Sequence, residues 1–328
     1  MIMDINEIVE IVRNFPGITR KHPIQDVVKY LPTADFKDIL ASAGEDAAVI
    51  KYKEDCLLFA ADGIMESLMK VNPFYAGYFA VLVNINDVAA MGGRPLAMVD
   101  VVSIRDNRIC AQVLKGMERA VRKFNVPIVG GHTHPDCEYN AIDIAIIGTA
   151  PCESVIYSHT AEVGDDVIFV MDLDGFYPPD LSFAWDTTTN KDDSLVRRQI
   201  EIMAQIGEAG LASAAKDMSN PGCLGTLGML LETSGKGALV HLNRIPTPEG
   251  VDFKQWLVSY QGCGFVITCP PKNSAMVLDL FSSVGMTGAV VGSVEDSPIF
   301  RIKNGDEERV LFDFSKDKIT GCIRKRRC

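Results

Sequence analysis

The feature that most constrains this 328-residue chain is an almost wholly apolar stretch at residues 80–91, Ala-Val-Leu-Val-Asn-Ile-Asn-Asp-Val-Ala-Ala-Met. We expect it to form the second half of a helix over residues 74–91, which ends where Gly92-Gly93 allows a left-handed cap. Asn84 and Asp87 are three residues apart and therefore share one face of this helix. A buried carboxylate costs several kcal/mol unless it is paired or binds a metal. A solvated face would also carry lysine and glutamate, which the stretch lacks, so we interpret Asp87 as a functional residue.

Two further acidic positions stand next to predicted strands. Asp46, within Gly44-Glu45-Asp46, leads directly into a strand at residues 47–50. Asp62, followed by a glycine, comes just after a strand at residues 56–60. Each alone is typical of a turn. An oxygen-only set of this kind suits Mg²⁺, which proteins usually hold with one or two carboxylates together with waters and nucleotide phosphates.

A second pair of glycines follows a predicted strand at residues 126–129, in the sequence Gly-Gly-His-Thr-His. Backbone N–H groups in such a turn can meet phosphate oxygens. Zinc binding by His132 and His134 is the alternative, although no third ligand lies nearby in the sequence. Neither a Walker-type motif nor Gly-x-Gly-x-x-Gly after a strand is present, which excludes a P-loop or Rossmann phosphate site.

The length favours two domains, and the pattern of elements indicates the fold class. Strands and helices alternate without a regular βαβ repeat, which predicts an α+β fold. We place the two domains at residues 1–152 and 153–328. In the second domain, residues 174–194 have no periodicity and are expected to form an insertion or long loop, and residues 194–215 are expected to form a helix.

Charge and cysteine usage narrow the cellular setting. The net charge of -11 argues against a nucleic-acid or anionic-membrane partner. No stretch is long and apolar enough to cross a membrane, and the beginning does not read as a signal peptide, so we expect a cytoplasmic protein. The nine cysteines form no Cys-x-x-Cys pair, and buried thiols in a reducing compartment are expected rather than disulfides or zinc ligands.

Taken in order, the motifs resemble a known superfamily. It comprises aminoimidazole ribonucleotide (AIR) synthetase, thiamine monophosphate kinase, selenophosphate synthetase and the hydrogenase-maturation dehydratase. The resemblance covers nearly the whole chain, and the matching segments are residues 44–48, 62–63, 84–95, 130–133 and 216–219. The block at residues 84–95 is the most specific of them. The opening at residues 15–21 is similar to the AIR synthase-related group known as methanogenesis marker protein 2.

The resemblance implies a two-domain fold of the AIR synthetase (PurM-like) type. Such proteins are homodimers whose N-terminal domains pair their sheets into a shared barrel, while the C-terminal α/β sandwich domain closes over nucleotide and substrate. ATP and Mg²⁺ would bind between them, with no nucleic acid or membrane as partner. By similarity, the metal ligands would be Asp46, Asp62, Asp87 and Asp217. The residues around the nucleotide would be Asn84, Gly130, Gly131, Thr133 and Ser219.

Two departures from the family pattern bear on the reaction. Thiamine monophosphate kinases carry acids where this chain has His132 and Asn220, which makes the present site less negative. Selenophosphate synthetases use an early reactive cysteine, and this chain has none before Cys56. The catalytic residue is thus unidentified, with Lys21 and His132 as candidates. The leading hypothesis is an ATP- and Mg²⁺-dependent enzyme that transfers phosphoryl to an oxygen of a small substrate. The alternative is a nucleotide-binding maturation or assembly factor without turnover.

Overall fold

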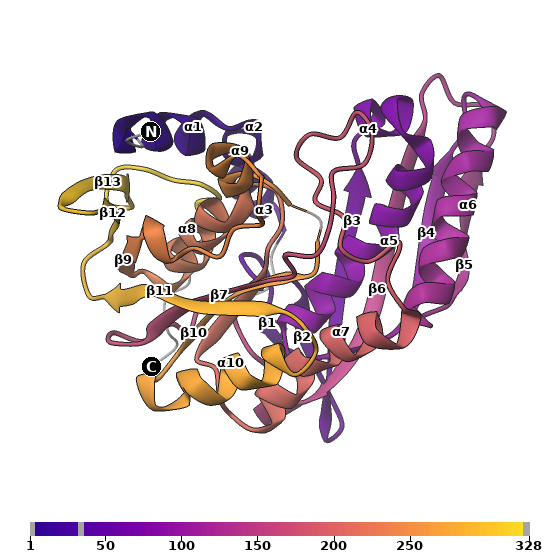
Figure 1. The fold of residues 1–328 in the computed structure, drawn as a ribbon. Helices are drawn as coiled ribbons and strands as arrows, with labels where there is room; N and C mark the ends of the chain where they lie inside the picture. Colours follow the sequence, from indigo (N-terminus) through magenta and orange to yellow (C-terminus); the bar gives the residue numbers. More distant parts are fainter. Residues whose placement is uncertain (1–3, 32–35, 261, 324–328) are drawn as a thin grey trace.

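The computed structural model describes residues 4–31, 36–260 and 262–323, and it contains two β-sheets with their helices (Figure 1). The first sheet is antiparallel except for its last pair. From one edge to the other, its strands are β1 (Ile39–Ala41), β2 (Ala48–Tyr52), β3 (Asp55–Ile64), β6 (Ala141–Pro151), β4 (Arg94–Ser103) and β5 (Ile128–His134).

One face of the first sheet is covered by helices and the other is open. Helices α4 (Glu66–Val71), α5 (Pro73–Ala90) and α6 (Asn107–Phe124) belong to this half, and α5 packs along β3, β4 and β6. The alternation of β6 follows from this arrangement, because its isoleucines at 142, 144 and 146 are buried under the helices. On the opposite face, four large apolar side chains are exposed: Phe59, Val99, Val101 and Val129.

The second sheet is covered on both faces. Its strands, in spatial order, are β13 (Glu307–Asp313), β12 (Ile299–Asn304), β9 (Gly237–His241), β11 (Thr287–Glu295), β7 (Asp166–Met171), β10 (Gly264–Cys269) and β8 (Ala214–Asp217). In Figure 1, α8 (Gly222–Ser234) lies on one side of the sheet, and α10 (Ser274–Ser282) with α7 (Asp193–Glu208) lies on the other. The short α9 (Phe253–Leu257) packs against α8.

The first three helices leave the first sheet and pack on the second half of the chain. They are α1 (Ile5–Asn14), α2 (Pro16–Thr19) and α3 (Ile24–Val28). Asp4 caps α1 by accepting a hydrogen bond from the Asn6 N–H. The apolar stripe of α1 then packs against β13 and α9, and α2 packs against α8 (Figure 1). The packing of α2 on α8 brings Arg20 and Lys21, the basic pair that follows α2, to the second half of the chain.

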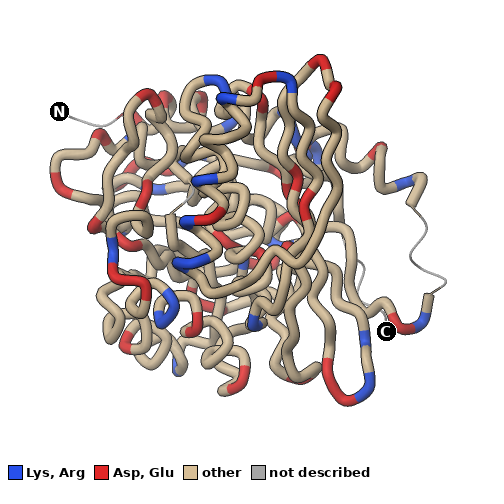
Figure 2. Tube along the Cα trace, turned by 90° about the vertical axis from the view of Figure 1, so that its right-hand side faces the viewer, with Lys and Arg blue, Asp and Glu red and all other residues tan. Residues whose placement is uncertain are grey.

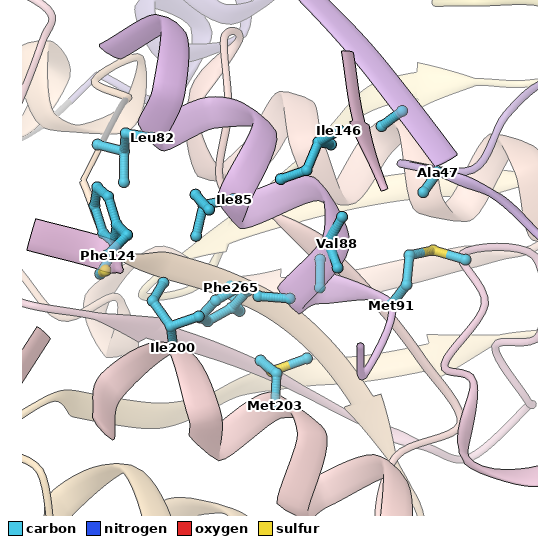
Figure 3. Packing of buried hydrophobic residues seen from close by; sticks show 14 of the residues in the cluster. Ala47, Leu82, Ile85, Val88, Met91, Phe124, Ile146, Ile200, Met203 and Phe265 are labelled. Atoms are coloured by element: carbon cyan, nitrogen blue, oxygen red, sulfur yellow. The ribbon is translucent and has the colours of Figure 1, made fainter. Parts of the chain in front are cut away.

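Helix α5 joins the two halves into one packed core. Figure 3 shows Ile85 and Val88 of α5 lying between Ile146 of the first sheet and a layer from the second half. That layer includes Met203 of α7 and Phe265 of β10. An all-round apolar helix is expected where both sides are covered by protein, and this explains why its sequence shows no polar face.

Residues 172–192 have no helix or long strand, as the sequence predicts, yet internal hydrogen bonds hold them in place. The Asp172 carboxylate accepts from Lys191 Nζ and from Gln199 Nε2, the latter at 2.8 Å. Asp186 Oδ1 accepts from the backbone N–H of Thr188 at 2.9 Å. This segment therefore forms a fixed wall rather than a free insertion.

The expected boundaries are wrong at three functional segments. Helix α7 ends at Glu208, and Gly210 with a φ of 60° turns the chain into β8, where a helix was expected. Asp62 lies inside β3, opposite Ile144, instead of after it. Residues 130–134 continue β5 as an edge strand parallel to β4, whereas the sequence predicts that the strand ends at residue 129. In each case tertiary pairing extends or creates a strand that local patterns do not reveal.

The expectation that every cysteine is a thiol is also wrong, because Cys56 and Cys152 form a disulfide with a Cα–Cα distance of 5.0 Å. The register of β3 against β6 places Cys56 opposite Ala150, which brings the two cysteines together.

In the described ranges, no helix is long and apolar enough to span a membrane. Figure 2 shows lysine and arginine scattered among aspartate and glutamate along the chain.

Candidate functional site

Three of the predicted aspartates meet where the two halves of the chain touch. Asp46 precedes β2, Asp87 lies in the last turns of α5, and Asp217 ends β8. One carboxylate oxygen from each lies within 4.8 Å of the other two. They come from three elements that are distant in sequence, and the packing of α5 against β8 brings them together.

Asp46 is neutralised by the protein itself. Its Oδ1 accepts from the ammonium group of Lys216, and its Oδ2 accepts from the backbone N–H of Asp217 at 3.3 Å. Lys216 also donates to Ser158 Oγ at 3.2 Å and to the Gly44 carbonyl oxygen at 3.4 Å. Both side chains of the pair are almost fully buried. Burial raises the pKa of Asp46, and Lys216 opposes that rise.

Asp87 and Asp217 lack a direct partner of this kind, although the charge of Lys216 favours their ionised forms. Within residues 4–31, 36–260 and 262–323, their carboxylate oxygens make no hydrogen bond or ion pair. Burial, followed by the charge of Asp217, raises the pKa of Asp87 well above its ordinary value. Burial and the charge of Asp46 raise the pKa of Asp217 to about 8. Two carboxylates without a hydrogen bond or ion pair, one of which lies in the wall of a cavity, indicate a site that is completed by a cation.

A cavity of about 530 Å³ opens beside this cluster, and Asp217 forms part of its wall. Asp62 lines the same cavity and accepts a hydrogen bond from the Gly63 N–H at 2.7 Å. Burial raises the pKa of Asp62, although this side chain is accessible from the cavity. Other parts of the wall come from the segment after α2, from the loop before α8 and from residues 180–184.

Two basic side chains, Arg20 and Lys21, line the same cavity as Asp62 and Asp217. Burial, and then the charge of Lys216, lowers the pKa of Lys21, while Asp62 and Asp217 favour its charged form. Lys21 is thus the one predicted catalytic candidate that the structure brings to the acidic cluster. A lysine ammonium group in the wall of a cavity is suited to phosphate contact.

Two buried amides add unsatisfied acceptors to this region. Asn84 is completely buried and donates to the Ala80 carbonyl oxygen at 2.8 Å, while Asn86 is 2% exposed and donates to the Gly262 carbonyl oxygen at 3.2 Å. The Oδ1 atom of each has no hydrogen-bond partner among the described residues. Asn86 also lines the cavity. Buried oxygens without donors fit a metal or a ligand with N–H or O–H groups better than an empty core.

Not all predicted site residues gather here. Ser219 lines the cavity, but Gly130, Gly131, His132 and Thr133 lie on the exposed edge strand β5 and do not. His132 and His134 stack edge to face with ring centroids 4.5 Å apart. In the part of the chain that the structure describes, no third ligand groups with them, so zinc gains no support.

Sequence reasoning missed Lys216 as a member of the site. The motif containing it is visible, but its ammonium group becomes important only because β8 places it beside Asp46. Glu45 is a second residue whose contacts the sequence does not predict. Its carboxylate accepts a hydrogen bond from the backbone N–H of Ser158 at 2.6 Å and contacts His159. The sequence does hold one signal for Lys216: this lysine directly precedes the predicted metal ligand Asp217 and follows a short apolar run.

Comparison with known proteins places these residues in a wider group. Residues 44–150 match the N-terminal domain of AIR synthase related proteins, and residues 180–303 match the C-terminal domain. An uncharacterized protein of Methanocaldococcus jannaschii is 45% identical over 98% of this chain and 100% of its own length.

Solved structures share the fold at lower identity. PurL of T. maritima complexed with AMPPCP has a TM-score of 0.77 and 17% identity over 98% of this chain and 52% of its own, so this chain spans about half of PurL. AaThiL complexed with AMPPCP and TMP has a TM-score of 0.64 and 19% identity, covering 88% of this chain and 96% of its own.

Proposed function

Because the chain belongs to the AIR synthase related family and carries, beside a cavity, two carboxylates without a direct partner, we propose that it binds ATP with Mg²⁺ and transfers phosphoryl to an oxygen atom of a small substrate. Asp87 and Asp217 carry the proposal. Their carboxylates make no hydrogen bond or ion pair within the described ranges, and a buried charge without such contacts is costly unless a ligand completes the site.

The chemistry of the donor set fits Mg²⁺, which prefers carboxylate and carbonyl oxygens. Of the four predicted ligands, Asp46, Asp62, Asp87 and Asp217, we propose that Asp87 and Asp217 hold the ion, because their carboxylates make no hydrogen bond or ion pair within the described ranges. When bound, Mg²⁺ would offset the charge of the phosphates and of the transition state. The two structural neighbours solved with AMPPCP support a nucleotide as the partner of the ion.

Side chains and backbone groups of the protein would bind and orient the phosphates. Lys21 and Arg20 line the same cavity as Asp62 and would orient the transferred group. Asn84 and Ser219 contact the backbone of two of these aspartates, since Asn84 Nδ2 lies 3.5 Å from the Asp62 carbonyl oxygen and the Ser219 N–H donates to the Asp217 carbonyl oxygen at 3.0 Å. His132, which lies on β5, is the less favoured catalytic candidate.

We also propose a homodimer built on the open face of the first sheet. Phe59, Val99, Val101 and Val129 lie on this face and expose apolar surface that a second copy would cover. Gly130, Gly131 and Thr133 extend along the edge strand of the same sheet, so their predicted contact with phosphate would arise in the dimer. Membership of the methanogenesis marker group stays a prediction.

Binding and turnover are tested separately. Saturating Mg-ATP is expected to raise the melting temperature of the wild type, because a ligand that binds only the native state stabilises it by roughly 2.7 kcal/mol at 100 times Kd. ATP with EDTA should have little effect, and Asp87→Asn should respond to neither. ADP release with pools of small acceptors then decides between an enzyme and a binding factor. No Mg-dependent stabilisation of the wild type would reject the proposal.

A further inference from the structure

Lys216 is the feature of this site that the proposed function does not use. Its side chain is 6% exposed and does not line the cavity, in contrast to Lys21. It therefore cannot contact a phosphate without leaving its present partners. Its position calls for a different role.

The surroundings of Lys216 are those of a bound cation. An ammonium group has three N–H donors, and the three acceptors around this one are a carboxylate, a hydroxyl and a carbonyl oxygen. All are oxygens, as they would be around a hard metal ion. The same Asp46 carboxylate also accepts the N–H of Asp217, so neither of its oxygens is free.

The charges of the cluster follow directly. Asp46, Asp87 and Asp217 carry three negative charges when ionised, and Lys216 cancels one of them. Asp62 and Lys21, which line the neighbouring cavity, favour each other's charged forms and add no net charge. Two negative charges remain on Asp87 and Asp217, the pair without hydrogen-bond partners in the described ranges. One divalent cation balances this remainder.

We propose that Lys216 is a fixed cation that takes the place of a metal ion at Asp46, so that the acidic cluster accepts a single divalent cation held by Asp87 and Asp217. This inference rests on the proposed function and refines it. Lys216 is a positioning and specificity-determining residue, because it sets the number of metal ions and acts through Asp46. Asp46 would then shape the site without being a metal ligand.

The test is a titration with Mn²⁺ alone, in which free Mn²⁺ is followed by electron paramagnetic resonance. The central variant is the double substitution Asp46→Asn with Lys216→Met. It removes both charges together and leaves neither unpaired, so it should fold, as a thermal melt would confirm. We expect one Mn²⁺ per chain in wild type and double variant alike, with dissociation constants within about threefold of each other.

The single substitution Lys216→Met gives the second measurement. It leaves Asp46 unpaired, and the added negative charge should tighten Mn²⁺ binding at least roughly tenfold or create a second site. Asp87→Asn should abolish binding at the cluster in either background.

The outcomes distinguish a failure of the role given to Lys216 from a failure of the proposed metal site. Loss of Mn²⁺ binding in the double variant would show that Asp46 is a ligand and would overturn the inference while leaving the proposed metal site intact. Unchanged or weaker binding in folded Lys216→Met would overturn it as well. A wild type that binds no Mn²⁺ would reject the metal site itself, and the inference with it.

Discussion

Gly17 packs directly against Asn220, so closely that a Cβ atom at position 17 would stand 1.8 Å from Asn220 Oδ1. Gly17 lies in α2, just before Arg20 and Lys21, and Asn220 lies in the cavity wall after Asp217. The contact therefore fixes the basic segment over the acidic site. Nothing in the sequence indicates that Gly17 and Asn220 touch.

Gly17→Ala is expected to destabilise the protein by about 1–3 kcal/mol through overpacking. It should also weaken the response of the melting temperature to Mg-ATP, because Arg20 and Lys21 are displaced. Chemical denaturation with and without nucleotide measures both effects. Adding Asn220→Ala should restore most of the lost stability, and a Gly17→Ala protein as stable as the wild type would show that the contact is not tight.

Asp87→Asn should make the metal-free protein more stable, by roughly 1–3 kcal/mol at neutral pH in EDTA. The physical reason is that an unpaired buried carboxylate is replaced by a neutral group of the same shape. Unfolding curves in EDTA measure the gain. The matched control, Asp306→Asn, alters an exposed turn between β12 and β13 and should change nothing. A loss of stability in Asp87→Asn would mean that the carboxylate is satisfied in the native protein.

Val99→Glu should convert a dimer to a monomer, since it places a charge in the centre of the open sheet face, where Val99 is 44% exposed. Light scattering coupled to size-exclusion chromatography reports the mass. Leu114→Glu is the control, because Leu114 is 47% exposed on α6, away from that face. If both variants and the wild type are monomers, the dimer proposal fails.

Asp317→Asn tests the contact that anchors α1. Asp317 receives two hydrogen bonds of 2.9 Å from Arg13, and the Arg13 hydrogen bond is the main reason that its pKa is lowered. A lowered folded pKa gives stability that is present above the unfolded pKa and is lost as the pH falls through the folded value.

The variant should therefore be less stable at pH 7 by ~1 kcal/mol, a modest value because both side chains are partly exposed. The difference should shrink below about pH 4, where the unfolded carboxyl group begins to bind protons. Denaturation series at several pH values measure it. Asp26→Asn, which breaks an exposed pair with Lys29, should show no comparable effect. A difference that grows toward low pH would contradict the assigned sign.

Reduction of the Cys56–Cys152 disulfide should lower the free energy of unfolding. The two cysteines are separated by 96 positions, and the chain-entropy account gives up to about 4 kcal/mol for a loop of that length. Unfolding with and without reductant measures the change. Cys110→Ser removes a thiol outside the bond and should leave the response to reductant unaltered. Equal stability in both conditions would show that the bond is absent or contributes nothing.

The sequence by itself determined the elements whose patterns are local. Helix α5, its glycine end at Gly92 and the amphipathic α1 with its Asp4 cap follow from spacing and capping chemistry, and all three are present. Asp87 could also be recognised from local sequence, because residues 80–91 contain no other charged side chain. The ordered motifs then gave the family, which the two matching domains show.

Only the tertiary structure decided which of these residues meet. Strand β8 has only four residues, Ala-Ala-Lys-Asp, which is too short for its sequence to predict a strand, and it forms because β10 pairs with it. That pairing places Lys216 against Asp46 and Asp217 against Asp87, so the charge of the site depends on contacts between residues about 130 or more positions apart. The same holds for the Cys56–Cys152 bond, which the β3–β6 register creates. Local patterns record which side chains a segment buries, whereas the partner of each buried charge is chosen by the packing of distant elements.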